Sequence, residues 1–569
     1  MKLVGAATSI LTALGLSSAP VSTDYTVTPH FTSGALDGLE VTISLRANAD
    51  GQTVLDLPDG GMGQKDRWRY ITDLRVTGAA VQDNGPAKRI LVSKPNALIK
   101  VQYRARSAYG NDPKGEDGNP YAGAAVLPMW FTTLGDFIFA SPEGRDHSPA
   151  TFTWGAAPRG WTLASDLDRT SADVPLTVAD VVNSTMLGGP DVHLYSRHIP
   201  GGDLRVAIRG QWSFSEQKFI DDIGEVVRAQ RDFWGDAHGS YFVSIIPLAT
   251  SPTNLSVGGT GKFRGFALYG TSNAEEFRLR RILAHEQTHN WIPSEQGLMP
   301  EGPKEPSYYW YSEGFTDFYT DRTLLRAGIW TPADFVAHLN EVLREYDNSP
   351  VRTAPNDRIV SGFWTDPDVQ KLAYERGYLL AFLWDEKMRR ATEGRIGLDQ
   401  VMFAMRDRYQ HSAESARPDL IENFESASRE RTGVDVRDDI QRFAIEGDPI
   451  TLPENLFRPC ANIGTVSVPS YDIGFDSAAS ARAGVFAGVD PAGPAYRAGL
   501  RNGMRRIARS GGEPGDSQAE ITYRVLDAAG AEHLIRYKPE GSRVIRFQQA
   551  SLSPPNGQAP DCTARLGGA

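Results

Sequence analysis

The first third of the chain contains short runs in which apolar and polar residues alternate. Such runs lie at residues 39–45, 89–92 and 98–103, and Asn, Asp, Gly and Pro separate them. A period of two is typical of half-buried strands, and those four residue types are typical of turns. The pattern predicts an N-terminal β domain, a β-sandwich, over residues 23–205, with β-rich segments continuing past residue 150.

From residue 206 the period of the apolar positions lengthens to that of helices. The pattern predicts a short strand at residues 241–247 and helices at residues 214–234, 274–291, 331–346, 374–390 and 396–409. Residues 206–450 are therefore predicted to form a mixed domain dominated by helices in its second half. A link that contains proline follows, and then a small β-rich module at residues 465–550. The tail at residues 553–569 is rich in Pro and Gly, which predicts irregular structure.

The N-terminus combines a basic start with an apolar run. Lys2 precedes the apolar residues 3–16, and small residues follow at Ser17 and Ala19. This arrangement resembles a secretory signal peptide over residues 1–22, which predicts export to the periplasm or the medium. A mildly apolar N-terminus without a targeting role is the alternative. The run is shorter than the about 20 residues that span a bilayer, and no other stretch qualifies, so we expect no transmembrane segment.

Composition narrows the chemistry that the chain can carry. The 569 residues have a formal net charge of −11, which disfavours nucleic acid as a partner because such surfaces are normally basic. The two cysteines, Cys460 and Cys562, are too few for a cysteine-built zinc cluster. Any metal site must therefore use His and carboxylate ligands. The cysteines flank the small module, where they form either a disulfide in an oxidising compartment or two free thiols.

One short motif suggests a metal site. His285 and His289 are four positions apart, so on a helix their side chains share one face at about 6 Å. Two imidazoles at that spacing can chelate one zinc ion. Glu286, next to the first histidine, can take a proton from a water molecule at the metal. The alternative is a pair of ordinary helix histidines beside a solvated glutamate.

Further residues downstream could complete such a site. A catalytic zinc site uses three protein ligands, and Glu313 follows His289 by 24 positions in a stretch with helical spacing. Asp317, four positions later, could accept a hydrogen bond from a zinc-binding imidazole and fix its tautomer. Tyr374, at the predicted start of a helix, could stabilise the oxyanion of a tetrahedral intermediate. Taken alone, Glu313 reads as a surface residue and Tyr374 as a core aromatic.

The segments HEQTHNW, YSEGFTDFY and YERG together resemble the glycyl aminopeptidase family of gluzincins, family sixty-one of the metallopeptidases. The resemblance implies a multidomain α+β protein with an N-terminal β domain, a thermolysin-like catalytic domain and a C-terminal PDZ domain. It also implies an aminopeptidase that acts on a peptide or protein substrate with one Zn²⁺ per chain. His285, His289 and Glu313 would be the ligands and Glu286 the general base.

One segment departs from this family. Family members carry a GGLEH-like edge strand whose Glu resembles the residue that binds the free amine of a substrate. Here Gly258 and Gly259 occupy the corresponding stretch, followed by Thr260, Gly261 and Lys262, and the Glu is absent. An endopeptidase or oligopeptidase therefore stays open as an alternative to the aminopeptidase, because a substrate ammonium lacks its carboxylate partner. A non-catalytic peptide-binding protein is a third hypothesis.

The small module resembles a PDZ domain in part. Ile473, Gly474 and Phe475 resemble the loop that binds the carboxylate of a peptide C-terminus, and residues 489–500 resemble the following turn into a helix. Met504 stands where Asp is usual. PDZ domains take peptides by strand addition, so the resemblance implies docking of a peptide C-terminus. The alternative is a module that only packs against the catalytic domain.

Overall fold

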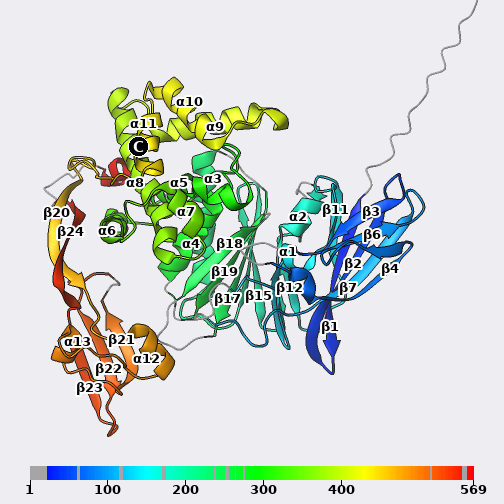
Figure 1. The fold of residues 1–569 in the computed structure, drawn as a ribbon, viewed down its shortest axis with the longest axis horizontal. Coiled ribbons are helices and arrows are strands. Elements are labelled where there is room, and N and C mark those ends of the chain that lie inside the picture. Colours follow the sequence, from blue (N-terminus) through cyan, green and yellow to red (C-terminus); the bar gives the residue numbers. More distant parts are fainter. Residues whose placement is uncertain are drawn as a thin grey trace, which may run out of the picture. The chain divides into compact units, whose positions relative to one another are not determined.

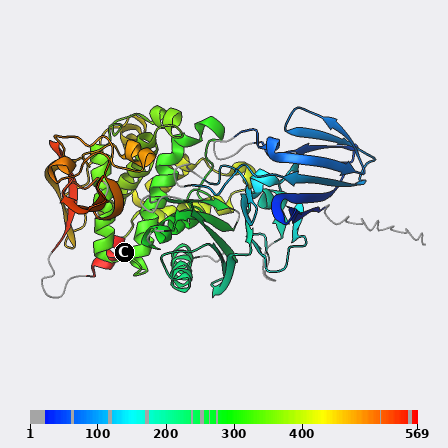
Figure 2. The same cartoon turned by 90° about the horizontal axis from the view of Figure 1, so that it is seen from below.

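The computed structural model describes residues 22–59, 65–114, 120–168, 175–235, 239–249, 256–262, 264–272, 274, 276–512, 515–553 and 561–568. The apolar run expected to act as a signal peptide lies outside the described residues. The chain divides into two compact units, one ending at Val192 and one beginning at His193. Two short segments are exceptions: Pro113–Pro120 belongs to the second unit, and Lys262–Arg264 belongs to the first. By colour, the first unit is blue to cyan and most helices of the second are green to yellow (Figure 1, Figure 2).

The first unit is β-rich, as the alternating pattern predicts. Its sheets have the strand orders β13-β11-β1-β2-β7-β4, β10-β3-β6-β5 and β12-β14-β9-β8. Its elements are β1 (Thr23–Thr32), β2 (Ala35–Arg46), β3 (Gln52–Asp56), β4 (Ile71–Thr77), β5 (Ala80–Asp83), β6 (Lys88–Val92), β7 (Leu98–Ala105), β8 (Ala125–Leu127), β9 (Trp130–Leu134), α1 (Gly135–Ile138), β10 (Ser141–Pro142), β11 (Pro149–Trp154), β12 (Thr162–Ser165), β13 (Leu176–Thr177), α2 (Val178–Val182) and β14 (Thr185–Gly189).

Strand register explains how this unit builds its own core. In the antiparallel pair β1–β2, Tyr25 lies opposite Ile43 and Val27 lies opposite Val41. All four side chains are fully buried. Successive side chains of a strand point to opposite faces, so the alternating sequence places these apolar residues on one face of the sheet.

The second unit combines a sheet with helices. The sheet has the strand order β15-β16-β17-β19-β18, with parallel pairing of β16 with β17 and of β17 with β19. Its elements are β15 (Val192–Ile199), β16 (Gly202–Arg209), α3 (Glu216–Trp234), β17 (Tyr241–Leu248), β18 (Val257–Lys262), β19 (Gly265–Thr271), α4 (Glu276–Thr288), α5 (Tyr309–Arg326), α6 (Pro332–Asn348), α7 (Asn356–Gly362), α8 (Pro367–Ala391), α9 (Leu398–His411), α10 (Leu420–Thr432) and α11 (Arg437–Asp439).

The structure corrects three expected boundaries. Residues 192–205 alternate like the preceding strands, but β15 and β16 belong to the sheet of the second unit. Helix α4 ends at Thr288, so His289 lies in the turn that follows it. Helix α8 begins at Pro367 rather than at Tyr374, because Asp366 caps its N-terminus by accepting from the Asp368 amide and proline is favoured at the first helical position.

The C-terminal module is joined to the helical part by a long strand pair. β20 (Ala461–Tyr471) pairs with β24 (Glu540–Leu552), and between them lie α12 (Ser477–Ala483), α13 (Pro494–Arg497), β21 (Arg505–Gly511), β22 (Ile521–Leu526) and β23 (Glu532–Tyr537). The pair packs on α6. The Asn340 side chain donates to the Ala550 carbonyl at 2.9 Å and accepts from the Ala550 amide at 2.7 Å.

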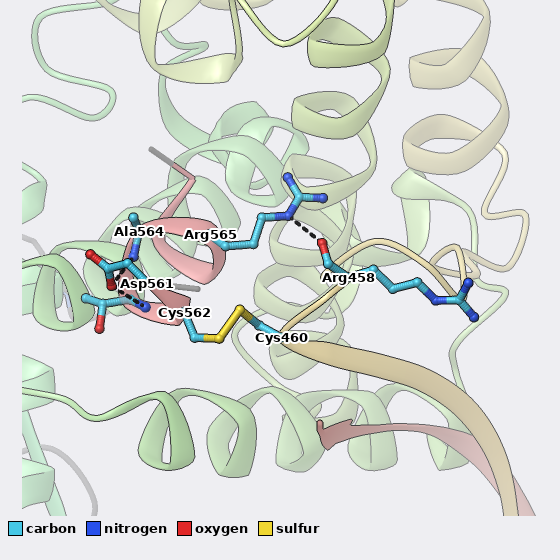
Figure 3. Close-up of a disulfide and its surroundings, with 7 residues drawn as sticks. Arg458, Cys460, Asp561, Cys562, Ala564 and Arg565 are labelled. Atoms are coloured by element: carbon cyan, nitrogen blue, oxygen red, sulfur yellow. Dashed lines mark hydrogen bonds between the residues drawn. A yellow bond between two sulfur atoms is a disulfide. The ribbon is translucent and has the colours of Figure 1, made fainter. Parts of the chain in front are cut away.

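A disulfide joins Cys460, just before β20, to Cys562 at the start of α14 (Cys562–Gly567) (Figure 3). The expectation of an irregular tail is therefore wrong for residues 562–567, because Asp561 caps a helix there by accepting from the Thr563 and Ala564 amides. Beside the disulfide, the Arg565 guanidinium donates to the carbonyl oxygens of Arg458 and Leu456. Among the described residues, no helix has both the length and the apolar character needed to cross a membrane.

Candidate metal centre

Helix α4 presents the first metal-binding candidates from a firmly packed position. Leu283 and Ala284 are fully buried, and His285 and Glu286 follow them on the helix. From α3, the Gln230 amide donates to the Ala284 carbonyl at 2.7 Å and to the Thr288 hydroxyl at 2.8 Å. These contacts attach α4 to α3 beside the two histidines.

Three side chains from α4, the turn after it and α5 converge on one point. Nε2 of His285 lies 3.3 Å and Nε2 of His289 lies 3.5 Å from Oε2 of Glu313. The ligand atoms of the three residues all lie within 4.8 Å of one another, as a site for one metal ion requires. Donors at about 2.0–2.1 Å from a tetrahedral zinc ion are about 3.3–3.4 Å apart. The arrangement and the His-His-carboxylate chemistry therefore fit zinc.

The other nitrogen of each imidazole has its own partner. Nδ1 of His285 lies 2.9 Å from a carboxylate oxygen of Asp317, and Nδ1 of His289 lies 2.9 Å from the carbonyl oxygen of Ile292. An acceptor at Nδ1 holds the proton there, which leaves Nε2 available as a metal ligand. The structure thus contains the predicted hydrogen bond between Asp317 and an imidazole of the histidine motif.

Arg281 holds Asp317 in place. Its guanidinium donates to Asp317 at 2.9 Å and to Asp321 at 2.9 Å, and the Tyr378 hydroxyl donates to Asp321 at 2.9 Å. Arg281 lies one helical turn before His285 on α4, so one helix face carries both the imidazole and the cation that orients its acceptor. The sequence prediction missed Arg281, although its spacing of four from His285 was a usable signal.

The charges of the cluster shift its pKa values strongly. Burial disfavours the charged form of His285, but the carboxylates of Asp317, Glu313 and Glu286 together outweigh burial and raise the pKa of His285 to about 10. Burial opposes the ionised form of Glu313 as well, yet the two imidazoles hold its pKa far below the usual range. The cluster therefore favours an ionised carboxylate, and a metal ion that binds His285 has to displace a proton.

Glu286 lies between the metal-binding candidates and the edge of the sheet. The Gly261 amide of β18 donates to Oε2 of Glu286 at 3.2 Å. β18 is the last strand in the order of this sheet, so Gly258 and Gly259 lie on an edge strand as expected. Side chains at these two positions would collide with Tyr269 and Phe266 of β19. The glycines therefore allow β18 to pack against β19 beside Glu286.

Tyr374 reaches the same cluster from α8. Its ring stacks on that of His285, with centroids 5.9 Å apart and planes inclined by 27°. Burial and the carboxylates of Glu313 and Glu286 raise the pKa of the Tyr374 hydroxyl well above its usual value. The hydroxyl is therefore protonated at neutral pH and can act as a hydrogen-bond donor.

A pair of glycines sets the distance between α5 and α8. A Cβ at Gly314, next to Glu313, would collide with the backbone of Gly377, and a Cβ at Gly377 would collide with the Trp310 carbonyl oxygen. The two helices thus cross in backbone contact. This contact brings Glu313 and Tyr374, one from each helix, to the same histidine, His285.

Aromatic residues near the two motifs take part in packing and in hydrogen bonding. Trp291 and Trp310 are buried in the core, and the Tyr308 hydroxyl donates to Asp419 at 2.9 Å. Tyr309 packs its ring against Phe363.

The loop at Ile473, Gly474 and Phe475 is held by hydrogen bonds of its neighbours. The Gly474 amide donates to the Asp472 side chain at 2.8 Å, and the Asp476 amide donates to the Ala487 carbonyl at 3.1 Å. Residues 477–483 then form α12. Docking of a peptide C-terminus at this loop stays a prediction.

Comparisons with known proteins find similarity to peptidases, in sequence for one segment and in structure for most of the chain. Residues 278–361 match the family model described as M61 glycyl aminopeptidase. A crystal structure of an aminopeptidase N family protein from Idiomarina loihiensis is similar at a TM-score of 0.66 and 15% identity, covering 94% of this chain and 98% of that chain. An M1 zinc metallopeptidase from Deinococcus radiodurans is similar at a TM-score of 0.48 and 15% identity, covering 77% of this chain and 96% of that chain. No curated protein matches.

The first of these structures shows that the chain shares the aminopeptidase N family fold, a multidomain α+β arrangement with a β-rich N-terminal region and a helical domain. The family match covers α4, the turn that contains His289, and α5, where all three metal-binding candidates lie. The match and the His-His-Glu cluster together support a zinc metallopeptidase.

Proposed function

We propose that the protein is a peptidase that uses one zinc ion per chain, held by His285, His289 and Glu313. The observation that carries the proposal is the convergence of their donor atoms at separations of 3.3 and 3.5 Å. The orientation of both imidazoles by partners at Nδ1 supports it further. A cluster of this kind that served only to stabilise the fold would not need a carboxylate such as Glu286 beside it.

Each residue around the metal site would have its own role in peptide hydrolysis. A zinc ion held by His285, His289 and Glu313 would supply Lewis-acid chemistry, polarising the scissile carbonyl and lowering the pKa of a water molecule. Glu286 accepts the proton of the attacking water and passes it to the leaving amine. The Gly261 amide holds the Glu286 carboxylate while it does so. Tyr374, kept protonated by burial, donates a hydrogen bond to the oxyanion of the tetrahedral intermediate.

The family match favours aminopeptidase action, and one observation favours a second candidate. β18 runs beside Glu286 but carries no carboxylate along Val257–Lys262. A free N-terminal ammonium would therefore find no acidic partner on this strand. An endopeptidase or oligopeptidase that accepts a continuous peptide along β18 is the second candidate.

A digest of a peptide library distinguishes these candidates. The purified protein is incubated with peptides that have free or acetylated N-termini, with and without a chelator, and mass spectrometry identifies the products. We expect cleavage that the chelator abolishes and added zinc restores. Stepwise loss of N-terminal residues from free peptides alone identifies an aminopeptidase, whereas internal cleavage of acetylated peptides identifies an endopeptidase. Cleavage that persists in the chelator would contradict the zinc mechanism.

Export is part of the proposal. The disulfide between Cys460 and Cys562 requires an oxidising compartment, and the N-terminal segment resembles a signal peptide. Fractionation of cells that produce the full chain, with N-terminal sequencing of the recovered protein, tests this. Recovery in the cytoplasm with an intact N-terminus and reduced cysteines would contradict it.

A further inference from the structure

Aromatic rings form a continuous row from the metal cluster towards the surface. The ring of Tyr374 stacks on His285 and, at 6.5 Å between centroids and 14° between planes, on Phe363. Phe363 in turn contacts Trp364 at 4.9 Å and Tyr309 at 4.5 Å. We call Tyr309, Phe363, Trp364 and Tyr374 the aromatic wall.

The outer end of the aromatic wall is open to solvent. Phe363 and Tyr309 are 4% and 7% exposed, whereas Trp364 is 62% exposed. Single apolar residues on a surface are common, but this one continues a packed row that starts at a metal-binding histidine. The exposed apolar surface of the row is therefore mainly the indole of Trp364 at its outer end.

The backbone holds Trp364 in place. It follows α7, and the amides of Thr365 and Asp366 both donate to the Gly362 carbonyl, at 3.0 and 2.9 Å. The Asp366 carboxylate, which also caps α8, accepts from Arg358 at 2.6 Å. Trp364 therefore lies on a closed turn between two helices, so little conformational entropy is lost when a ligand packs on it.

The aromatic wall also lies one helical turn from the metal ligand Glu313. Tyr309 precedes Glu313 by four positions on α5, so the two side chains share one face of the helix. The Tyr309 ring contacts Phe363 and Trp364. A peptide whose scissile bond is at the metal would place a neighbouring side chain against this row.

We propose that the aromatic wall is a binding subsite for a large apolar or aromatic side chain of the peptide substrate, close to the scissile bond. The inference rests on the proposed peptidase function and adds the substrate class. A phenyl or isobutyl group laid against Trp364 removes apolar surface of both partners from water, whereas glycine removes almost none. The preference therefore differs from the glycine preference that the family description implies.

Two peptide series test the subsite, identical except that one carries Phe and the other Gly at each position flanking the cleaved bond. For the wild-type protein we expect kcat/KM to be at least about tenfold higher for the Phe peptide at one flanking position. Trp364→Ala lowers this ratio to near one, and Trp364→Phe retains most of it. Val544→Ala, at a valine that is 73% exposed on β24, is the matched control and leaves the ratio unchanged.

Binding to the Glu286→Gln protein, measured by calorimetry with the same peptides, separates this inference from the proposed function. Tighter binding of the Phe peptide that Trp364→Ala abolishes supports the subsite even if the wild-type protein cleaves nothing, in which case the proposed function alone fails. Equal binding of Phe and Gly peptides overturns the subsite even if both are cleaved. A ratio that Trp364→Ala does not change overturns it as well.

Discussion

His285 connects the metal cluster to the network that orients it. Nε2 faces Glu313 and His289, while Nδ1 faces Asp317, which Arg281 holds in turn. The His285 imidazole is thus constrained by carboxylates from both sides, whereas the partners of Nδ1 of His289 among the described residues are the uncharged Ile292 carbonyl and Thr316 hydroxyl. We infer that His285 fixes the geometry of the site and that His289 completes the ligand set.

Replacing His289 with Ala tests the ligand set. The variant loses one of three protein ligands, so we expect its zinc affinity to fall by more than the about 10–100-fold that removing a hydrogen-bond partner of a ligand costs. Zinc content after dialysis against a weak chelator is the measurement. His411→Ala, at an exposed histidine on α9, serves as the control. Unchanged zinc content of the His289 variant would remove that residue from the ligand set.

Sequence spacing and resemblance were enough to predict which residues gather at the candidate metal site. His285, Glu286 and His289 follow from one motif, and Glu313, Asp317 and Tyr374 follow from helical spacing and resemblance; the structure brings all six together. Phe363 and Trp364 were not predictable in the same way. Their contacts with Tyr374 and Tyr309 join three separate segments of the chain, and no local pattern encodes such a meeting.

At the scale of elements, the crossing of α5 with α8 matters most for the site. Gly314 and Gly377 allow the two backbones to touch, so the Glu313 and Tyr374 side chains both reach His285. The glycines stand in the YSEGFTDFY and YERG segments, next to or near the residues that carry the chemistry. The segments therefore encode a helix contact as well as reactive groups.

Gly377→Ala tests this role. The added methyl group would collide with the Trp310 carbonyl oxygen, so the helices must separate, and overpacking of this kind typically costs about 1–3 kcal/mol. We expect a lower melting temperature and a fall in kcat/KM, because Tyr374 moves away from the metal. Gly464→Ala on β20, where a Cβ would meet open space, is the matched control. A Gly377 variant with wild-type stability and activity would refute the positioning role.

The element predictions failed where a cap or a short helix overrides the longer pattern. The sequence Asp366-Pro367 marks the start of α8, seven residues before Tyr374, and Asp476 caps α12 by accepting from the Ala479 amide. Both signals are local and were available. Residues 477–483 form a helix because an Ala-rich segment with a good cap favours one there.

At the scale of the whole molecule, alternation along the chain cannot show which sheet a strand joins. Residues 192–205 alternate as the strands of the first unit do, yet β15 and β16 pair within the second unit. Strand assignment to a sheet depends on pairing partners far away in the sequence, such as β17 for β16. The β-rich and helical character of the two units was predictable, and their boundary was not.

The C-terminus contacts helices α5 and α8 as well as the C-terminal module. Arg326 of α5 donates to the Gly567 carbonyl at 2.6 Å and Arg389 of α8 donates to the Gly568 carbonyl, while the disulfide ties α14 to the residue before β20. We expect these hydrogen bonds and the disulfide to hold the C-terminal module against the helices of the second unit.

Removing the disulfide tests this expectation. Cys460 and Cys562 are 102 positions apart, and on the chain-entropy model a loop of that length contributes up to about 4.7 kcal/mol to the free energy of unfolding. We expect the Cys460→Ser/Cys562→Ser protein to melt at a lower temperature than the oxidised wild type, and the reduced wild type to match it. Equal melting temperatures with and without reductant would contradict a stabilising disulfide.

The central claim is that Glu286 is the general base of a zinc-dependent peptide hydrolysis, and Glu286→Gln tests it most directly. The substitution keeps the size of the side chain and an oxygen for the Gly261 amide, and it leaves His285, His289 and Glu313 in place. Zinc content and peptide turnover are measured on the same purified sample. The account predicts wild-type zinc content with turnover reduced by about 100-fold or more. Wild-type turnover at full zinc content would contradict it.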